Sequence, residues 1–176
     1  MCKLFKDGHK VIPTVDSLEK VKELPKVEEY VLKDNDSFGS GIGQKIVKSN
    51  ELRKEYKQGQ VIQPKLTFKA EVQCYFIGDR LMYVYEYIPS KYPNYPIPNL
   101  ITLNENERKL ANDFATLTNL SVGFQRIDFL RLEDDSLILL EIEDNSPHMN
   151  LEELSENYRD IVLEEYKKNL YKYLEN

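Results

Sequence analysis

The chain has 176 residues, of which 41% are hydrophobic and 31% charged, and its formal net charge is -6 at pH 7. This length and composition predict a globular protein with one sizeable core or two small lobes that share one. The net negative charge argues against nucleic acid as the main partner, because proteins that bind it usually have a positively charged surface. No apolar run approaches the roughly 18 residues that span a bilayer. Cys2 and Cys74 lie far apart and outside any metal-ligand spacing, which argues against a disulfide framework and a zinc site. We therefore expect a cytoplasmic protein with neither nucleic acid nor a membrane as partner.

Hydrophobic periodicity and turn residues divide the first part of the chain into short elements. A short amphipathic helix over 15–24 closes before Pro25, and Ser49 caps a second short helix that ends at residue 56. Because proline donates no backbone hydrogen bond, Pro64 must lie at the edge or the end of its strand. The pattern predicts three strands around these helices, over residues 27–33, 43–47 and 60–66.

The rest of the chain is predicted to form antiparallel hairpins with helices between them. A Gly-Asp turn separates two runs of aromatic and β-branched residues, which indicates a long hairpin over 71–89. Asn104 and Ser155 cap two further helices. A stripe on the last helix is expected to pack in the core, and it comprises Tyr158, Ile161, Val162, Tyr166, Leu170 and Tyr173. Antiparallel hairpins with interspersed helices are typical of the α+β class.

A second hairpin, RIDFLRLEDDSLILLEIED, begins at Arg126 and carries charges inside its apolar runs. A two-residue loop at 134–135 pairs Asp128 with Glu141. The same register pairs Arg126 with Glu143. Opposed residues of antiparallel strands share a face, and so do alternate residues along one strand. All four charges therefore project from one face, and the other face comprises Ile127, Phe129, Ile138, Leu140 and Ile142.

Three carboxylates this close repel one another, and one arginine leaves about two negative charges uncompensated. Such a cluster is stable if it faces water, if a carboxylate takes up a proton, or if a hard cation binds among the oxygens. On the hairpin alone, a solvated strand face with a salt bridge is the simplest explanation. The alternative is a magnesium site, because Mg²⁺ accepts one or two carboxylates and completes its octahedron with water and substrate phosphates.

Two features upstream favour a ligand that carries phosphate. Lys33 ends a strand just before the glycine-rich segment DSFGSGIG (residues 36–43), whose backbone N–H groups suit phosphate oxygens. The spacing fits neither the P-loop nor the dinucleotide fingerprint, and a simple hairpin turn is the alternative. The QPKL segment at 63–66 has the form of a strand that leaves a sheet edge, where backbone groups can pair with an adenine.

The order of these motifs, followed by Arg-Ile-Asp and Glu-Ile-Glu, resembles the ATP-grasp superfamily. This superfamily includes ATP-dependent carboxylate–amine ligases and the ATP-binding domain of glutathione synthetase. The resemblance extends from about Gly8 to Leu151 and is best in RIDFLR (126–131) and LEIEDNSPHMNL (140–151). The last segment is similar to the Glu-x-Glu variant of the family's metal-binding strand, which Pro147 follows at the family's spacing.

The resemblance implies a role for individual residues. Lys33 matches the lysine that contacts ATP phosphate, Arg126 matches an arginine that contacts phosphate or acyl phosphate, and Glu71 lies near the carboxylate that commonly binds ribose. The loop that covers the phosphates would include Ser37, Gly39, Gly41 and Gly43. The hinge that holds the adenine would comprise Gln63, Pro64, Lys65 and Leu66. The Mg²⁺ ligands would be Asp128, Glu141 and Glu143, with Asn145 as a further candidate on the same face.

As a whole, the resemblance implies an ATP-grasp core that binds ATP and Mg²⁺ between two β-rich lobes. The small lobe would span residues 15–62, the large lobe residues 63–176, and residues 1–14 would be the remnant of a preceding region. The implied reaction is that of an ATP-dependent ligase, which converts a small-molecule carboxylate to an acyl phosphate and joins it to an amine.

The sequence departs from the family's pattern in two places. The family's N-terminal domain has no counterpart, which is compatible with a fragment, a naturally short protein, or a subunit completed by a homodimer or a partner subunit. Tyr85, Glu86 and Tyr87 stand where family members often place a basic residue. The alternative function is therefore a truncated, non-catalytic nucleotide-binding or regulatory subunit that needs a partner for activity.

Overall fold

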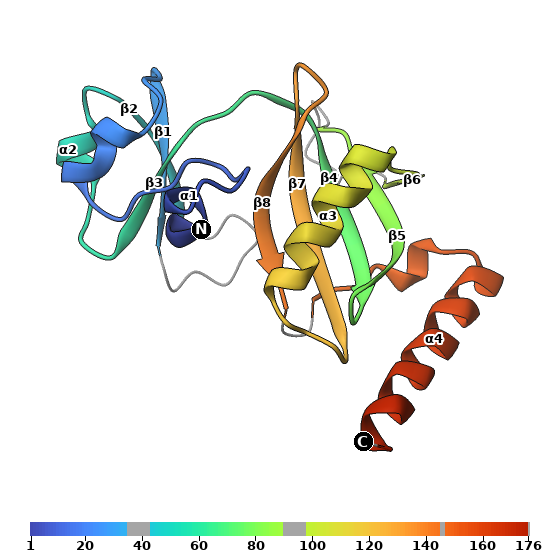
Figure 1. Cartoon of the computed structure of the whole chain (residues 1–176). Coiled ribbons are helices and arrows are strands. Elements are labelled where there is room, and N and C mark those ends of the chain that lie inside the picture. The colour runs from blue at the N-terminus through green and yellow to red at the C-terminus, as the bar shows by residue number, and fades with distance from the viewer. Residues whose placement is uncertain (35–42, 90–97, 145–146, 176) are drawn as a thin grey trace. The chain divides into compact units, whose positions relative to one another are not determined.

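The computed structural model describes residues 1–34, 43–89, 98–144 and 147–175. It divides into two compact units, Met1–Thr67 and Phe68–Asn176, and each unit contains its own sheet (Figure 1). None of the helices in the described ranges is long and apolar enough to cross a membrane.

The first unit is built on a three-stranded antiparallel sheet in the order β2-β1-β3. Its elements are α1 (Cys2–Lys6), the 3-10 helix η1 (Leu18–Glu23), β1 (Glu29–Asp34), β2 (Gln44–Lys48), α2 (Leu52–Glu55) and β3 (Gln60–Pro64). Alternate residues of the strands face a small core that comprises Val15, Leu24, Tyr30, Leu32, Val47, Leu52 and Ile62. Pro64 ends β3 at an edge of this sheet, as predicted.

Two short helices of this unit differ from the sequence-based expectation. The prediction that Ser49 caps α2 is wrong, because Glu51 is the cap and its side chain makes no capping hydrogen bond. The N–H of Ser49 instead donates to the carbonyl of Glu28 at 2.8 Å, which extends the β1–β2 ladder and delays the helix. The helix α1 was not expected, and its five residues include none that is buried.

The second unit is built on a five-stranded antiparallel sheet in the order β6-β5-β4-β7-β8. Its strands are β4 (Phe68–Ile77), β5 (Arg80–Tyr87), β6 (Asn99–Ile101), β7 (Phe124–Leu132) and β8 (Leu137–Glu143). The short strand β6 was not expected from the sequence. The unit also contains α3 (Glu105–Leu117), the 3-10 helix η2 (Leu151–Glu153) and α4 (Glu156–Leu174).

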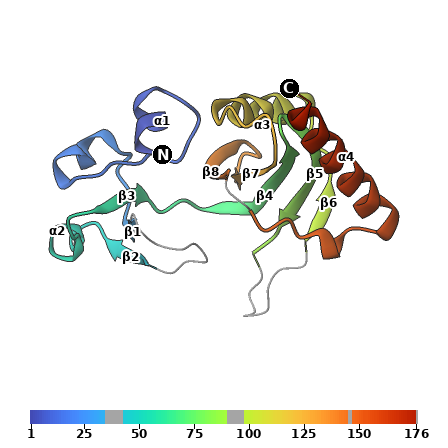
Figure 2. The same ribbon diagram turned by 90° about the horizontal axis from the view of Figure 1, so that it is seen from below.

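The two long helices contact opposite faces of this sheet, as their packing partners show, and Figure 2 shows where α3 and α4 lie. Phe114 of α3 lies with its ring centre 5.9 Å from that of Phe129 on β7. Val162 of α4 is buried in a cluster with Tyr75 of β4. Val72 of β4 is the pairing partner of Phe129, and Tyr75 is an odd number of residues from Val72. Tyr75, and with it Val162, therefore lies on the other face of the sheet. The expected core stripe on α4 is only partly correct, because Ile161 and Tyr173 are 56% and 64% exposed.

The β7–β8 hairpin has the predicted register at its charged residues, but its loop length and its pairing near the loop differ from the prediction. The N–H of Leu132 donates to the carbonyl of Ser136 at 2.9 Å, so the loop has three residues and not the predicted two. Asp135 completes this loop at a φ of 65°, the left-handed conformation common in three-residue hairpin loops. The pairing then skips Leu140, and this irregularity compensates for the extra loop residue.

Because the pairing skips Leu140, the predicted register holds at the charged end of the hairpin but not at the loop end. Arg126 pairs with Glu143 and Asp128 with Glu141, which confirms the prediction at the charged end. At the loop end, Leu139 and Leu137 are buried at 0% and 2% exposure. The prediction that Ile138 and Leu140 face the core is therefore wrong, because the register there is shifted by one residue.

Candidate functional site

The charged residues of the hairpin belong to two rows that cross three strands of the five-stranded sheet. Gln73 of β4, Asp128 of β7 and Glu141 of β8 form one row of directly opposed residues. Tyr75, Arg126 and Glu143 form the next row. Since opposed residues share a face, both rows present their side chains on the face opposite α3.

Arg126 lies at the centre of these rows and donates to several carboxylate oxygens. Its Nε lies 2.8 Å from Oδ1 of Asp128, and its Nη2 lies 2.8 Å from Oδ2 of the same residue. The same Nη2 donates to Oε1 of Glu143 at 2.7 Å, and it lies 3.9 Å from Oε1 of Glu141. A single guanidinium therefore bridges all three carboxylates, with a bidentate pair to Asp128.

The cluster is buried on one side and open on the other. Asp128 is 0% exposed and Arg126 is 8% exposed, which excludes a simple solvated strand face for these two residues. The side chains of Glu141 and Glu143 remain 48% and 37% exposed. Burial raises the pKa of the Asp128 carboxyl to about 8, although the hydrogen bonds and charge of Arg126 act to lower it. The buried carboxylate therefore favours any cation that can neutralise it.

The geometry of the three carboxylates is compatible with a hard cation. One oxygen from each of Asp128, Glu141 and Glu143 can be chosen so that all lie within 4.8 Å of one another. Opposite ligands of an octahedral Mg²⁺ lie roughly 4.2 Å apart, twice the magnesium–oxygen distance. Among three ligands of one octahedral ion at least two pairs are adjacent and lie roughly 3 Å apart, so the side chains must move inward before all three oxygens bind one Mg²⁺. A set made only of carboxylate oxygens also has the ligand chemistry that Mg²⁺ prefers.

A hydrogen-bonded chain connects this cluster to the segment after β8. The Nη1 of Arg126 donates to the carbonyl of His148 at 3.2 Å, and Nδ1 of the His148 ring is hydrogen-bonded to Oδ1 of Asn150. Asn150 donates through Nδ2 to the hydroxyls of Tyr75 and Tyr87, at 2.6 and 2.8 Å. Asn150 was not predicted from the sequence, where its one local signal is that asparagine tolerates the left-handed backbone found there, with a φ of 47°.

The same chain continues to Glu71, which the sequence assigned to ribose binding. The Tyr75 hydroxyl donates to Oε1 of Gln73 at 2.6 Å, and Nε2 of Gln73 donates to Oε1 of Glu71 at 2.7 Å. Burial raises the pKa of Tyr75, so its hydroxyl keeps its proton and acts as a donor in this chain. The structure therefore brings Glu71 to the same face as the three carboxylates.

Two of the predicted nucleotide-binding residues of the first unit, Lys33 and Gln63, share the face of the small sheet that lies opposite its core, whereas Pro64 is opposed to Tyr30 on the core face. Lys33 is opposed to Val61, and Val31 of the same face is opposed to Gln63. The amide of Gln63 is buried and donates to the hydroxyl of Thr14 at 2.9 Å, so this side chain already has a structural partner. Gly43 accepts a hydrogen bond from Asp34 at the end of the β1–β2 ladder. Ser37, Gly39 and Gly41 lie outside the described residues, as does Asn145.

The backbone of the predicted hinge has one side available for a ligand. The N–H of Lys65 donates to the carbonyl of Glu29 at 3.0 Å, and its ammonium pairs with the carboxylate of the same residue. Because backbone groups alternate in direction along a strand, the carbonyl of Pro64 and the N–H of Leu66 point away from β1. These two backbone groups can form a donor and acceptor pair for the edge of an adenine.

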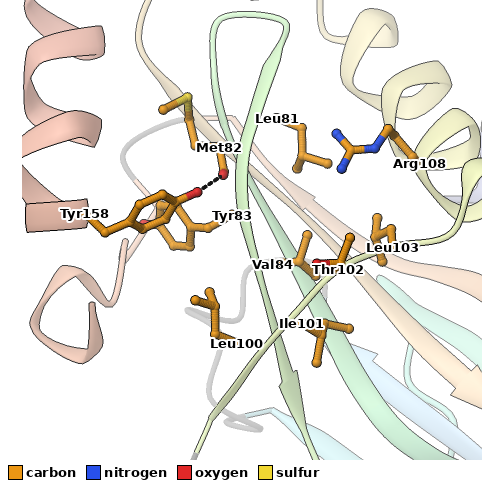
Figure 3. Close-up of a pocket in the computed structure, with 10 residues that line it drawn as sticks. All are labelled: Leu81, Met82, Tyr83, Val84, Leu100, Ile101, Thr102, Leu103, Arg108 and Tyr158. Atoms are coloured by element: carbon orange, nitrogen blue, oxygen red, sulfur yellow. Dashed lines mark hydrogen bonds between the residues drawn. The ribbon is translucent and has the colours of Figure 1, made fainter. Parts of the chain in front are cut away.

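A pocket of about 250 Å³ lies elsewhere in the second unit, at the edge of its sheet. Figure 3 shows that it is surrounded by β5, by β6 and the segment that follows it, by Arg108 of α3 and by Tyr158 of α4. The hydroxyl of Tyr158 donates to the carbonyl of Met82 at 2.7 Å at its rim. None of the sequence-predicted site residues within the described ranges lines this pocket, so it is separate from the carboxylate cluster.

Comparison with solved structures identifies the architecture. D-cycloserine synthetase DcsG matches with a TM-score of 0.68 and 19% identity, over 96% of this chain and 68% of its own. The ATP-grasp ligase PsnB, solved with a minimal precursor, Mg and ADP, matches with a TM-score of 0.61 and 15% identity, over 85% of this chain and 50% of its own. D-alanine–D-alanine ligase from Bacillus anthracis matches with a TM-score of 0.61 and 19% identity, over 98% of this chain and 63% of its own.

These matches rest on structure and not on sequence. No protein-family model matches the sequence, and no curated protein matches it either. The chain spans 50% to 68% of the length of the three proteins named above. Its α+β architecture is the one predicted, with antiparallel three- and five-stranded sheets packed with helices. From these sheets and these structural matches we conclude that the chain has the ATP-grasp fold.

Proposed function

We propose that this chain binds Mg-ATP and forms the ATP-grasp core of a ligase that joins a carboxylate to an amine or a similar nucleophile. One observation carries the proposal. Asp128, Glu141 and Glu143 converge within 4.8 Å beside a buried arginine, in a chain whose fold is that of ATP-dependent ligases. The fold neighbour PsnB was solved with Mg and ADP, which supports the same ligand class for this chain.

Each predicted residue has a role in this proposal. The three carboxylates hold Mg²⁺, which would neutralise phosphate charge when it is bound. Lys33 contacts the nucleotide phosphates, Arg126 contacts the transferring phosphoryl group, and Glu71 accepts a hydrogen bond from the ribose. The loop with Ser37, Gly39, Gly41 and Gly43 covers the phosphates. At the hinge, the adenine pairs with the carbonyl of Pro64 and the N–H of Leu66, while Gln63 and Lys65 hold this strand in place through Thr14 and Glu29.

The proposed chemistry has two displacements. An oxygen of the substrate carboxylate attacks the γ-phosphorus, the bond to the β–γ bridging oxygen breaks, and ADP leaves with that electron pair. The amine then attacks the acyl carbon, inorganic phosphate leaves, and the nitrogen loses a proton to solvent or base. The residues of this chain contribute positioning and charge neutralisation, and none of them becomes a covalent nucleophile.

The proposal includes the setting in which the chain acts. The substrates are a small-molecule carboxylate and an amine, the location is the cytoplasm, and a second copy or a partner subunit completes the substrate pocket. The proposed lobes are residues 15–62 and 63–176, and their boundary falls inside β3. Tyr85 and Tyr87 stand in place of a basic residue on β5, so this position adds no positive charge to the phosphate environment.

A thermal unfolding experiment tests the nucleotide part of the proposal. Mg-ATP at about 100 times its dissociation constant should raise the melting temperature of the wild-type chain by about 5–10 °C. Glu141→Gln should lose most of that shift, because it removes one metal ligand that is largely exposed and not needed for folding. Glu86→Gln is the matched control, since Glu86 pairs with Arg131 on the opposite face of the same sheet.

The outcomes separate the two candidate functions. No shift in a folded wild-type chain would refute Mg-ATP binding. A shift together with release of ADP when carboxylates and hydroxylamine are supplied would support the ligase. A shift without ADP release, in the chain alone and with any partner subunit, would instead support a non-catalytic nucleotide-binding subunit.

A further inference from the structure

Arg126 occupies the same oxygen atoms that a metal ion would use. Both carboxylate oxygens of Asp128 accept hydrogen bonds from it, at 2.8 Å each from Nε and Nη2, and Glu143 accepts a further one at 2.7 Å. These residues also belong to the one group of acidic side chains in the described ranges whose oxygens converge as metal ligands do. A guanidinium and a metal ion therefore compete for one set of lone pairs.

We infer that Arg126 is a resident counter-ion that makes the three carboxylates selective for a divalent cation bound to nucleotide phosphate over the free cation. This inference rests on the proposed function. It assigns to Arg126 a role in the nucleotide-free protein, in addition to any contact with the transferring phosphoryl group.

Arg126 weakens the attraction of the carboxylates for a free cation. A positive charge held within 4 Å of all three carboxylates neutralises part of their field and repels an incoming cation. The pair is largely removed from water, because Asp128 is 0% exposed and Arg126 is 8% exposed, so solvent screens this repulsion poorly. Free Mg²⁺ must then displace a buried bidentate ion pair in order to bind.

A bound nucleotide changes this balance by giving Arg126 a new partner. A phosphate offers the guanidinium another bidentate acceptor, with a geometry similar to that of a carboxylate. Arg126 can therefore transfer hydrogen bonds from Asp128 and Glu143 to phosphate oxygens while the metal takes over the carboxylates. No buried charge is left unpaired in this exchange, whereas a free metal ion provides no acceptor for the displaced arginine.

A second arginine on the same strand provides a matched control. Arg131 also binds two carboxylates, Glu86 of β5 at 2.8 Å and Glu107 of α3. It points to the opposite face of β7, because its position differs in parity from that of Arg126. Removing this arginine takes away the same charge from the same strand but leaves the metal-binding carboxylates and their counter-ion in place.

Binding of Mn²⁺ alone, followed by electron paramagnetic resonance, is the test. We expect Arg126→Gln to bind Mn²⁺ at least about tenfold more tightly than wild type without nucleotide, since a nearby unit charge is lost. Because a divalent ion carries twice the charge of a proton, removing the arginine improves the electrostatic free energy of metal binding twice as much as that of protonation. The metal is therefore favoured even if a carboxylate protonates. Arg131→Gln should bind Mn²⁺ as weakly as wild type, and ADP should increase Mn²⁺ affinity in wild type far more than in Arg126→Gln.

The results distinguish failure of this inference from failure of the proposed function. Equal affinity of Arg126→Gln and wild type for free Mn²⁺, with wild type still binding Mn²⁺ and ADP together, would overturn the inference alone. Absence of Mn²⁺ binding in every folded variant, with and without ADP, would overturn both.

A second measurement needs no variant and remains valid if Arg126→Gln does not fold. The Nε–H of Arg126 is buried and hydrogen-bonded to Asp128, so it should give a slowly exchanging signal in ¹⁵N-edited spectra. Mg²⁺ with ADP should shift this signal, whereas Mg²⁺ alone at the same concentration should not. An equal shift by Mg²⁺ alone would contradict the inference.

Discussion

The strand β7 carries two arginines that bind carboxylates on opposite faces of one sheet, and the two arrangements differ in how their charges are distributed. Arg131 links Glu86 of β5 to Glu107 of α3, so its two partners come from separate elements. Arg126 links Asp128, Glu141 and Glu143, whose oxygens converge within 4.8 Å of one another. The first arrangement joins a helix to a sheet, and the second concentrates negative charge at one point.

The difference explains why only one of these clusters is a candidate for ligand binding. Arg131 leaves one negative charge uncompensated, and its two carboxylates also serve the fold, since Glu107 completes the capping box of α3 with Asn104. Arg126 is outnumbered by three carboxylates, of which Asp128 is fully buried. An excess of charge around a buried group destabilises the protein unless a ligand compensates it. Such an excess is what distinguishes a binding site from a structural ion pair.

Replacing each arginine by methionine should give the largest difference between the two clusters. Arg126→Met leaves three neighbouring carboxylates without a counter-ion and should cost about 3–5 kcal/mol of unfolding free energy in the absence of divalent ions. Millimolar Mg²⁺ should restore part of this loss, because the ion can take the place of the guanidinium.

Arg131→Met is the comparison variant. Its carboxylates come from different elements, so we expect a loss of about 1–3 kcal/mol and no recovery with Mg²⁺. Urea unfolding with and without Mg²⁺ measures both effects. Equal responses of the two variants to Mg²⁺ would contradict the distinction drawn between the clusters.

A more gradual effect is expected in the pH dependence of stability. Burial raises the pKa of Asp128 to about 8, so the folded chain binds more protons at this carboxyl than the unfolded chain between about pH 4 and pH 8. The contribution of Asp128 to stability should therefore fall as pH rises through that interval, by at most about 1.4 kcal/mol per pH unit.

The matched variant for this effect is Asp128→Asn, which keeps the shape of the side chain and cannot ionise. Wild type should lose stability relative to this variant as the pH rises from 5 to 8, as measured by urea unfolding. A difference between the two proteins that stays constant across this range would show that Asp128 does not titrate with a raised pKa.

The pairing within this site was predictable from the sequence, although the loop length and the irregularity that produce it were not. Arithmetic from an assumed two-residue loop placed Asp128 opposite Glu141, and the structure has that pair. The actual loop has three residues, and the skipped residue Leu140 restores the register before the charged positions. A sequence pattern of alternating residues cannot locate such an irregularity, because it depends on how Leu137 and Leu139 pack in the core.

Other features depended on contacts that a linear pattern does not contain. Ser49 has the chemistry of a helix cap, but its N–H bonds across to Glu28 and keeps it in the strand ladder. Asn150 lies far from Tyr75 in sequence, and only the folded chain brings its amide to that hydroxyl. The burial of Asp128 was likewise not predicted, because alternation indicates which face a residue occupies but not what covers that face.

The most direct test of the central claim is a calorimetric titration of Mg-ATP into wild type, Asp128→Asn and Arg131→Gln. The account predicts that wild type and Arg131→Gln bind Mg-ATP with similar affinity, and that Asp128→Asn, folded but without the negative charge of its buried metal ligand, binds at least about tenfold more weakly. Equal binding by Asp128→Asn and wild type, or no binding by folded wild type, would contradict it.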